Sequence, residues 1–207
     1  MSTIPVSLTE KQFDKHIRPY ISTAKRGFES KIPLFKIFNY VLYRLHTGCQ
    51  WYRLPIAAEA SNPDKKEISH DAVYYHFRKW SRDGSLQKVW EYSIMIISPT
   101  LNLSEINLDG SLVIAKKSGQ AVAYQGRKKA KTTNILPMTR NRKTAKRGRK
   151  RFFNQEVYKR RFTSERSFAW IDKFRALLLR FDRCEAYFLG AHFIAFAMIN
   201  LRHLLHD

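Results

Sequence analysis

Apolar residues recur at helical spacing in the first third of the chain, between recognisable boundary residues. Thr9 and Gln12 have the spacing of a capping box, which predicts a first helix from about Glu10 to Ile21. Pro33 and Gly48 mark the start and end of a second predicted helix. Its apolar stripe consists of Phe35, Phe38, Leu42 and Leu45. Residues 57–66 are polar and are expected to form a loop.

A third helix is predicted from His70 to Ser81, with Ser69 as its cap. Its inward positions are Val73, Phe77 and Trp80, and its opposite face carries Asp71, Tyr74, Tyr75 and Arg78 with Lys79 beside them. A fourth helix follows Gly84 and runs to about Ile97. Short helices with a basic and aromatic outer face are typical of a helix-turn-helix module. A plain helical bundle is the alternative interpretation.

The period of the pattern changes after residue 105. Ile106–Ser111 is predicted to be a strand that ends in a carboxylate and a turn. Shorter β-like pieces at 112–115, 121–124 and 131–137 predict a small antiparallel meander. Residues 139–151 contain eight Lys/Arg and a single apolar residue, Ala145, so they are not a buried strand.

The pattern becomes helical again toward the C-terminus. Positions 170, 171, 174, 177, 178 and 181 are apolar at helical spacing, which predicts a helix with one core-facing side. Tyr187–Leu205 is predicted to be the last helix and is apolar on nearly all sides. Such a helix is normally buried against a sheet. If the sheet is partial, its apolar faces are expected to pack on the N-terminal helices or on a second copy. Together these elements predict an α+β protein.

Charge adds information about partners. The 207 residues include 38 Lys/Arg and 17 Asp/Glu, a formal charge of +21. Between Ser111 and Glu165 there are 17 basic residues and two acidic ones, Glu156 and Glu165. A polyanion, and nucleic acid first, is the partner that this excess favours. A solvated basic tail or a localisation signal is the alternative. The two cysteines form no disulfide framework, and no apolar run is long enough to span a membrane.

Glu165 is a carboxylate in a strongly basic stretch, with Arg161 four residues before it and Asp172 seven after it. One interpretation is an exposed ion pair with Arg161, which contributes only ~0.3–0.5 kcal/mol. The other is a metal ligand beside DNA phosphates.

Three segments resemble the DDE transposases of bacterial insertion sequences, in the group named for insertion sequence five. Gly48–Pro55 resembles the N-terminal motif of that group, and residues 107–111 with 124–134 resemble the region of its first catalytic Asp. Residues 158–173 resemble its Tyr-Arg-Glu-Lys signature.

The resemblance implies a helical, helix-turn-helix-like DNA-binding domain over residues 1–100 and an incomplete ribonuclease H-like α/β domain over residues 101–207. Asp109 and Glu165 carry over as catalytic metal ligands for Mg²⁺ or Mn²⁺, ions that take carboxylate oxygens. Tyr158 and Arg161 match the first two signature positions, whereas Lys173 lies one residue beyond the expected spacing, where Asp172 stands.

The family's middle catalytic Asp has no counterpart here, because no Asp lies between Asp109 and Glu165. The intervening residues are too few for the meander, a crossover and a further acidic strand. We interpret this as an in-frame internal deletion near residues 138–140. Glu156, the only acid in between, follows the basic run closely.

The sequence therefore predicts a transposase by descent with an impaired catalytic site, which binds double-stranded DNA at the terminal inverted repeats of its element. The predicted DNA contacts are Tyr74, Tyr75, Arg78, Lys79, Tyr158, Arg161 and Lys173. A cytoplasmic, nucleoid-associated bacterial protein is expected, and self-association is left open. The rival interpretations are a non-catalytic binder that represses transposition, an unrelated RNA-binding protein, and a pseudogene product without function.

Overall fold

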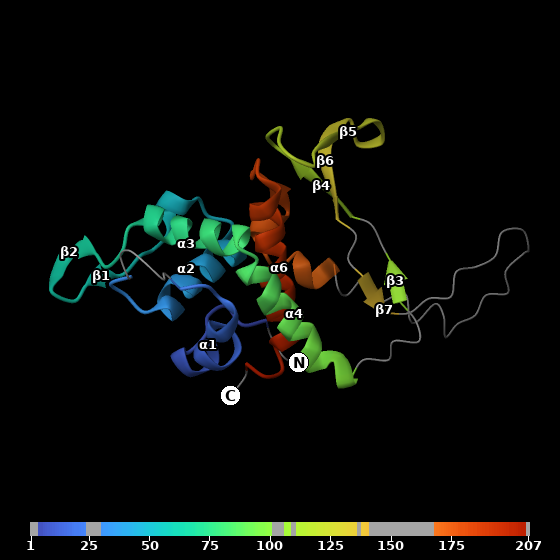
Figure 1. The fold of residues 1–207 in the computed structure, drawn as a ribbon. Coiled ribbons are helices and arrows are strands. Elements are labelled where there is room, and N and C mark those ends of the chain that lie inside the picture. Colours follow the sequence, from blue (N-terminus) through green and yellow to red (C-terminus); the bar gives the residue numbers. More distant parts are fainter. Residues whose placement is uncertain are drawn as a thin grey trace, which may run out of the picture.

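The structure is a computed structural model that describes residues 4–23, 30–100, 106–108, 111–135, 138–140 and 168–205. It combines helices with small sheets, which confirms the α+β class at that level. In Figure 1 the helices gather on one side of the molecule, and most of the strands lie beyond the end of this helical group.

The first helix, α1 (Glu10–His16), begins at the predicted capping box. Thr9 Oγ1 accepts from the backbone N–H of Gln12 at 3.3 Å, and Gln12 Oε1 accepts from the N–H of Thr9 at 2.9 Å. The helix ends earlier than the predicted Ile21. A short 3-10 turn, η1 (Arg18–Tyr20), replaces its last turn, because Pro19 cannot donate the backbone hydrogen bond that a helix interior needs.

The second helix, α2 (Leu34–Thr47), ends at Gly48 as predicted, and Gly48 has the left-handed φ of 69°. The following 3-10 turn, η2 (Trp51–Arg53), lies against the third helix. A further turn, η5 (Arg175–Leu177), approaches so closely that a Cβ on Gly48 would lie 3.3 Å from Ala176 N. The Gly48–Pro55 segment therefore lies where α2, the third helix and η5 meet.

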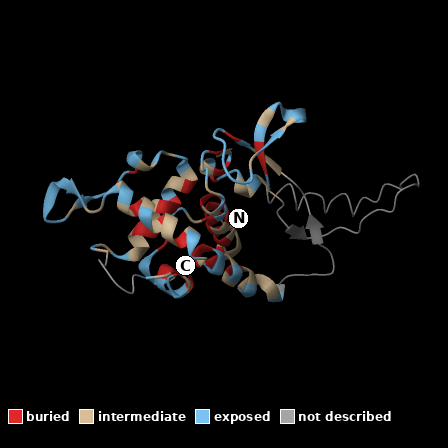
Figure 2. Ribbon diagram, turned by 45° about the horizontal axis from the view of Figure 1, so that its top comes forward, coloured by how far each residue is buried: buried red, intermediate tan, exposed pale blue. Residues whose placement is uncertain are grey.

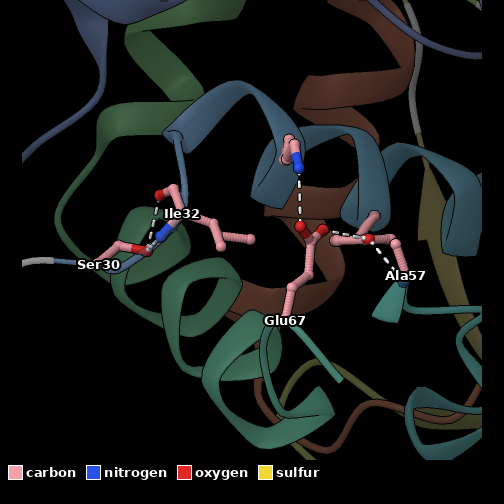
Figure 3. A network of polar contacts seen from close by, with 6 residues as sticks. Ser30, Ile32, Ala57 and Glu67 are labelled. Atoms are coloured by element: carbon pink, nitrogen blue, oxygen red, sulfur yellow. Dashed lines mark hydrogen bonds and ion pairs between the residues drawn. The ribbon is translucent and has the colours of Figure 1, made fainter. Parts of the chain in front are cut away.

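Residues 57–66 form a hairpin rather than the expected loop. Strand β1 (Ala58–Glu59) pairs with β2 (Asn62–Lys66), and the hairpin projects from the helices in Figure 1. Glu67 attaches its base to α2, because its carboxylate accepts from Lys36 Nζ at 2.7 Å and from the Tyr40 hydroxyl at 2.6 Å (Figure 3). Tyr40 in turn accepts from the N–H of Ala57 at 3.0 Å. The turn chemistry of the hairpin was missed because its residues are polar and solvent-exposed.

The third and fourth helices agree with the prediction. Helix α3 (His70–Arg82) buries Val73, Phe77 and Trp80. Ser69 caps it by accepting from the N–H of Ala72 at 3.1 Å. Helix α4 (Ser85–Ile97) follows Gly84 and is extended by a 3-10 turn, η3 (Ser98–Thr100).

The predicted small antiparallel sheet is present. Strand β4 (Ser111–Ala115) pairs with β6 (Ala130–Ile135), which pairs with β5 (Ala123–Gln125); the turn η4 (Gly126–Lys128) joins β5 to β6. The strand order β5-β6-β4 is not that of the predicted meander, because β4 pairs with β6 and not with β5. Strand β3 (Ile106–Leu108) pairs with β7 (Met138–Arg140), and this pair has the same register as β4 with β6. The predicted deletion point at 138–140 therefore lies in a paired strand.

The helix predicted across residues 170–181 is wrong. Only residues 168–171 are helical; after them come η5 and a short strand, β8 (Leu179–Arg180), which pairs in parallel with β4. Phe174 and Leu177 are buried, but Leu178 and Phe181 are about half exposed. Apolar spacing alone could not distinguish a helix from the observed turn and strand, because both bury positions 174 and 177. Only the strand also pairs its backbone with the edge of β4.

The last helix, α6 (Glu185–Leu201), does not pack on a sheet as expected. It packs on α3 and α4, and Asn200 donates to Ser93 of α4 at 3.0 Å. At Gly190 the approach is so close that a Cβ would lie 2.4 Å from Ser81 Oγ. The buried residues consequently concentrate among the helices (Figure 2), in one cluster that includes Phe77, Leu86 and Ile194. Of the two alternatives stated for a partial sheet, packing on the N-terminal helices is the one observed.

Candidate nucleic-acid interface and carboxylate site

The outer face of α3 carries four of the predicted DNA contacts. Tyr75 is the most accessible of them, with 62% of its surface exposed. Lys79 is partly exposed, and Arg82 adds a further cation one turn below Arg78. Asp71 is an acid on this helix, and it lies in the first turn, where negative charge is favourable.

Arg78 is held in a fixed position by two tyrosines. Its Nε donates to the hydroxyl of Tyr187 at 2.9 Å. Its guanidinium carbon lies 5.5 Å from the ring centre of Tyr74 and 5.6 Å from that of Tyr187. The hydrogen bond raises the pKa of Arg78 above its ordinary value, so the group stays charged. Arg78 therefore presents a positioned cation rather than a freely moving one.

Tyr187 is a residue that the sequence analysis did not connect to this face. It lies on α6, is 7% exposed, and also has Arg82 stacked at 5.1 Å from its ring centre. No local pattern could indicate the contact, because 109 residues separate Tyr187 from Arg78. Tyr74 also packs within the protein, because its ring centre lies 4.9 Å from that of Trp51. The Gly48–Pro55 motif thus supports α3 through its tryptophan.

A second basic surface lies on the small sheet. Residues 111–135 contain six basic residues and no acid, and all six are exposed: Lys116, Lys117, Arg127, Lys128, Lys129 and Lys131. Arg180 differs from them because it is 1% exposed. It donates to Thr133 Oγ1 at 2.6 Å and to the carbonyls of Gln120 and Asp182 at 2.7 and 2.9 Å. Burial lowers the pKa of Arg180. The three acceptors hold its guanidinium in place and connect β8 to β6 and to the segment before β5.

A cavity lies between the sheet and the C-terminal segment. It brings together Ser111, Asp172 and His192 from three separate elements. The remaining lining is mostly apolar and comprises Leu112, Val113, Ile135, Phe168, Ile171, Leu177 and Leu178. In sequence, Ser111 is two residues after Asp109, and Phe168 is three residues after Glu165. The flanks of the two predicted catalytic motifs therefore meet at one place.

His192 is nearly fully buried at this cavity. Its Nδ1 lies 2.8 Å from the carbonyl of Phe188, so this nitrogen carries the proton and Nε2 is left as an acceptor. Nε2 has no partner among the described residues. Burial lowers the pKa of His192 to about 4, which keeps the ring neutral at physiological pH.

The remaining predicted site residues divide into two groups. Asp109, Tyr158, Arg161 and Glu165 lie outside the described residues. Lys173 is exposed, and its Nζ lies 5.7 Å from the ring centre of Trp170, which Arg202 also contacts at 3.8 Å. Within the described ranges no three His, Cys, Asp or Glu gather into a metal site.

Two further observations concern the helices and the cysteines. In the described part of the chain, no helix combines the length and the hydropathy needed to cross a membrane. Cys49 and Cys184 are both free thiols and partly exposed.

Comparison with known families gave a match to the N-terminal region. Residues 8–90 match the family model described as "Putative transposase of IS4/5 family (DUF4096)". The matched region contains α1, α2, α3 and the first part of α4, and it includes the Gly48–Pro55 motif. The resemblance to insertion-sequence transposases is thereby confirmed for this region. No curated protein and no solved structure gave a significant match to the chain.

Proposed function

We propose that this chain, whose residues 8–90 match a transposase family, is a transposase derivative that binds the terminal inverted repeats of its mobile element. The family match carries the proposal. The outer face of α3 supports it, because this helix lies inside the matched region and displays Tyr75, Arg78 and Lys79. Such a face suits a helix that enters the major groove as part of a helix-turn-helix-like domain.

We further propose that the C-terminal part descends from a ribonuclease H-like DDE domain. In support, the residues that flank Asp109 and Glu165 meet at one cavity. Ser111, which lines this cavity, is two residues from Asp109 in the sequence, and Phe168, which also lines it, is three residues from Glu165. Asp109 and Glu165 would hold Mg²⁺ or Mn²⁺, which in such enzymes activates the attacking oxygen and stabilises the leaving one.

We propose that metal-dependent DNA cleavage by this chain is impaired. No Asp stands between the two motifs, and the described residues offer no cluster that replaces it. A site that lacks one of three carboxylates places the second ion poorly. The same observation favours a second candidate function, a repressor that occupies element ends without cutting them.

A competition binding experiment tests the proposal. The full chain is mixed with labelled duplex from the DNA that flanks the coding region, and unlabelled flanking or shuffled duplex is added. Preferential displacement by the flanking duplex is expected, because base-edge contacts from α3 depend on sequence. Equal displacement by both duplexes would contradict recognition of element ends.

A further inference from the structure

The ribbon formed by β5, η4 and β6 combines concentrated positive charge with an exposed aromatic ring. Tyr124 of β5 is 67% exposed, more than any other large hydrophobic side chain that the structure describes. Arg127, Lys128 and Lys129 follow it at the turn, and Lys131 is the second residue of the return strand β6. No described residue from 111 to 135 carries a negative charge that would offset them.

The register places the ring and a cation side by side. Tyr124 and Lys131 are directly opposite each other in the antiparallel pair of β5 and β6. Directly opposed residues project from the same face of a sheet. Lys131 Nζ donates to Ser118 Oγ at 2.6 Å, in the connection between β4 and β5. Tyr124 and a basic residue are thus cross-strand neighbours on one face, and the tyrosine ring is open to solvent.

The ribbon is a fixed platform rather than a loose loop. Thr133 Oγ1 donates to the carbonyl of Ala121 at 3.0 Å and accepts from Arg180 at 2.6 Å. Lys128 Nζ donates to the carbonyl of Leu112 at 3.1 Å, across to β4. Gly119 lies so close to Arg183 that a Cβ would be 2.4 Å from its carbonyl oxygen. These contacts tie β6, η4 and the segment before β5 to neighbouring parts of the protein.

We propose that this ribbon binds unpaired DNA, with Tyr124 stacked on a base and Arg127, Lys129 and Lys131 along the phosphates. An exposed aromatic ring beside cations is the arrangement by which proteins bind single strands with little sequence preference. A paired base is already stacked on both sides and offers no face to Tyr124. The proposal rests on the proposed function, since it assigns a second contact of the chain to DNA.

Fluorescence anisotropy with the full chain tests the ribbon. The probes are a labelled oligothymidine of about 15 nucleotides, the RNA of the same length, and the element-end duplex. Tyr124→Ala is expected to weaken binding of the oligothymidine roughly 5- to 150-fold while duplex binding changes little. Tyr124→Trp should keep the affinity, because stacking is retained.

Tyr43→Ala is the matched control, because Tyr43 is a partly exposed tyrosine on α2, 42% exposed. Its binding of all three probes should equal that of the parent chain. Equal losses in Tyr124→Ala and Tyr43→Ala, equal losses on single strand and duplex, or tighter binding of RNA than DNA would overturn the ribbon proposal. Failure of the parent chain to bind any duplex would instead overturn the proposed function. Unchanged thermal melting of Tyr124→Ala shows that the loss is not unfolding.

Discussion

The hydroxyl of Tyr187 on α6 accepts a hydrogen bond of 2.9 Å from Nε of Arg78 on α3. This contact links the last helix of the chain to the helix with the predicted DNA contacts. It fixes Nε toward the protein and leaves the two terminal guanidinium nitrogens without a partner among the described residues. A guanidinium presented in this way can meet a guanine edge or a phosphate.

Replacing Arg78 by Ala should weaken binding to the element end by roughly 5- to 150-fold, and binding to random duplex by less. The reason is that a base contact depends on sequence, whereas a phosphate contact does not. Tyr187→Phe is the companion variant, because it keeps the ring and removes only the acceptor. It should show a smaller loss in the same filter-binding assay. An equal loss for Arg78→Ala on both DNAs would assign Arg78 to the phosphate backbone.

Binding should fall steeply as salt is added. Each phosphate neutralised by a Lys or Arg releases condensed counterions, so log affinity falls with log salt with a slope of about −0.9 for each contact. The six exposed cations of residues 111–135 and those of α3 predict a slope of several units. Affinity measured across a salt series gives the slope directly. A slope near zero would exclude nucleic acid as the partner.

Gly190→Ala should destabilise the protein. The new Cβ would lie 2.4 Å from Ser81 Oγ and 2.9 Å from Ser81 Cβ, so α6 and α3 must separate. Overpacking of this kind costs about 1–3 kcal/mol, which exceeds the ~1 kcal/mol that Ala gains over Gly in a helix. Urea unfolding measures the difference.

Gly126→Ala is the control for this experiment, because a Cβ at Gly126 meets no atom within 4 Å. Its stability should change by less than about 0.5 kcal/mol. If Gly190→Ala were as stable as the control, the packing of α6 on α3 described above would be incorrect.

Stability should also decrease when the pH falls from 7.5 to 5. The pKa of His192 is about 4 in the folded protein, against about 6.5 in the unfolded chain. The unfolded state therefore binds more protons across this window, and stability is lost as the pH falls below about 6.5. This group alone predicts a loss of about 2 kcal/mol by pH 5.

Burial also lowers the pKa of His16, His46 and His76, so they add to the trend in the same direction. His192→Leu should make the dependence shallower, and replacement of the exposed His203 by Gln should leave it unchanged. Guanidinium unfolding of each variant at pH 7.5 and at pH 5 measures how much stability is lost between the two pH values. An unaltered pH dependence in His192→Leu would show that His192 is not the main source.

The sequence was most informative where a local pattern determines structure. The Thr9–Gln12 capping box, the left-handed Gly48 and the inward face of α3 were all predicted, because each depends on residues a few positions apart. Contacts between distant segments were not predictable in this way. Tyr187 with Arg78, and Arg180 with Thr133, join residues whose separation in sequence carries no signal.

The same limit explains the error at residues 170–181. Phe174 and Leu177 are buried in the turn and strand just as they would be in a helix, so apolar spacing does not discriminate. The strand is favoured over the helix because β8 pairs with the edge of β4. The predicted catalytic residues Asp109 and Glu165 and the proposed domain boundary near residue 100 stay predictions.

The central claim is that this chain binds element DNA without completing its cleavage. The most direct measurement incubates purified protein with labelled element ends and Mg²⁺ or Mn²⁺, and follows nicked and joined products on a denaturing gel. The account predicts a DNA-bound complex with no metal-dependent product, and unchanged binding in Asp109→Ala. Robust cleavage that disappears in both Asp109→Ala and Glu165→Ala would contradict it, because it would show an intact catalytic site.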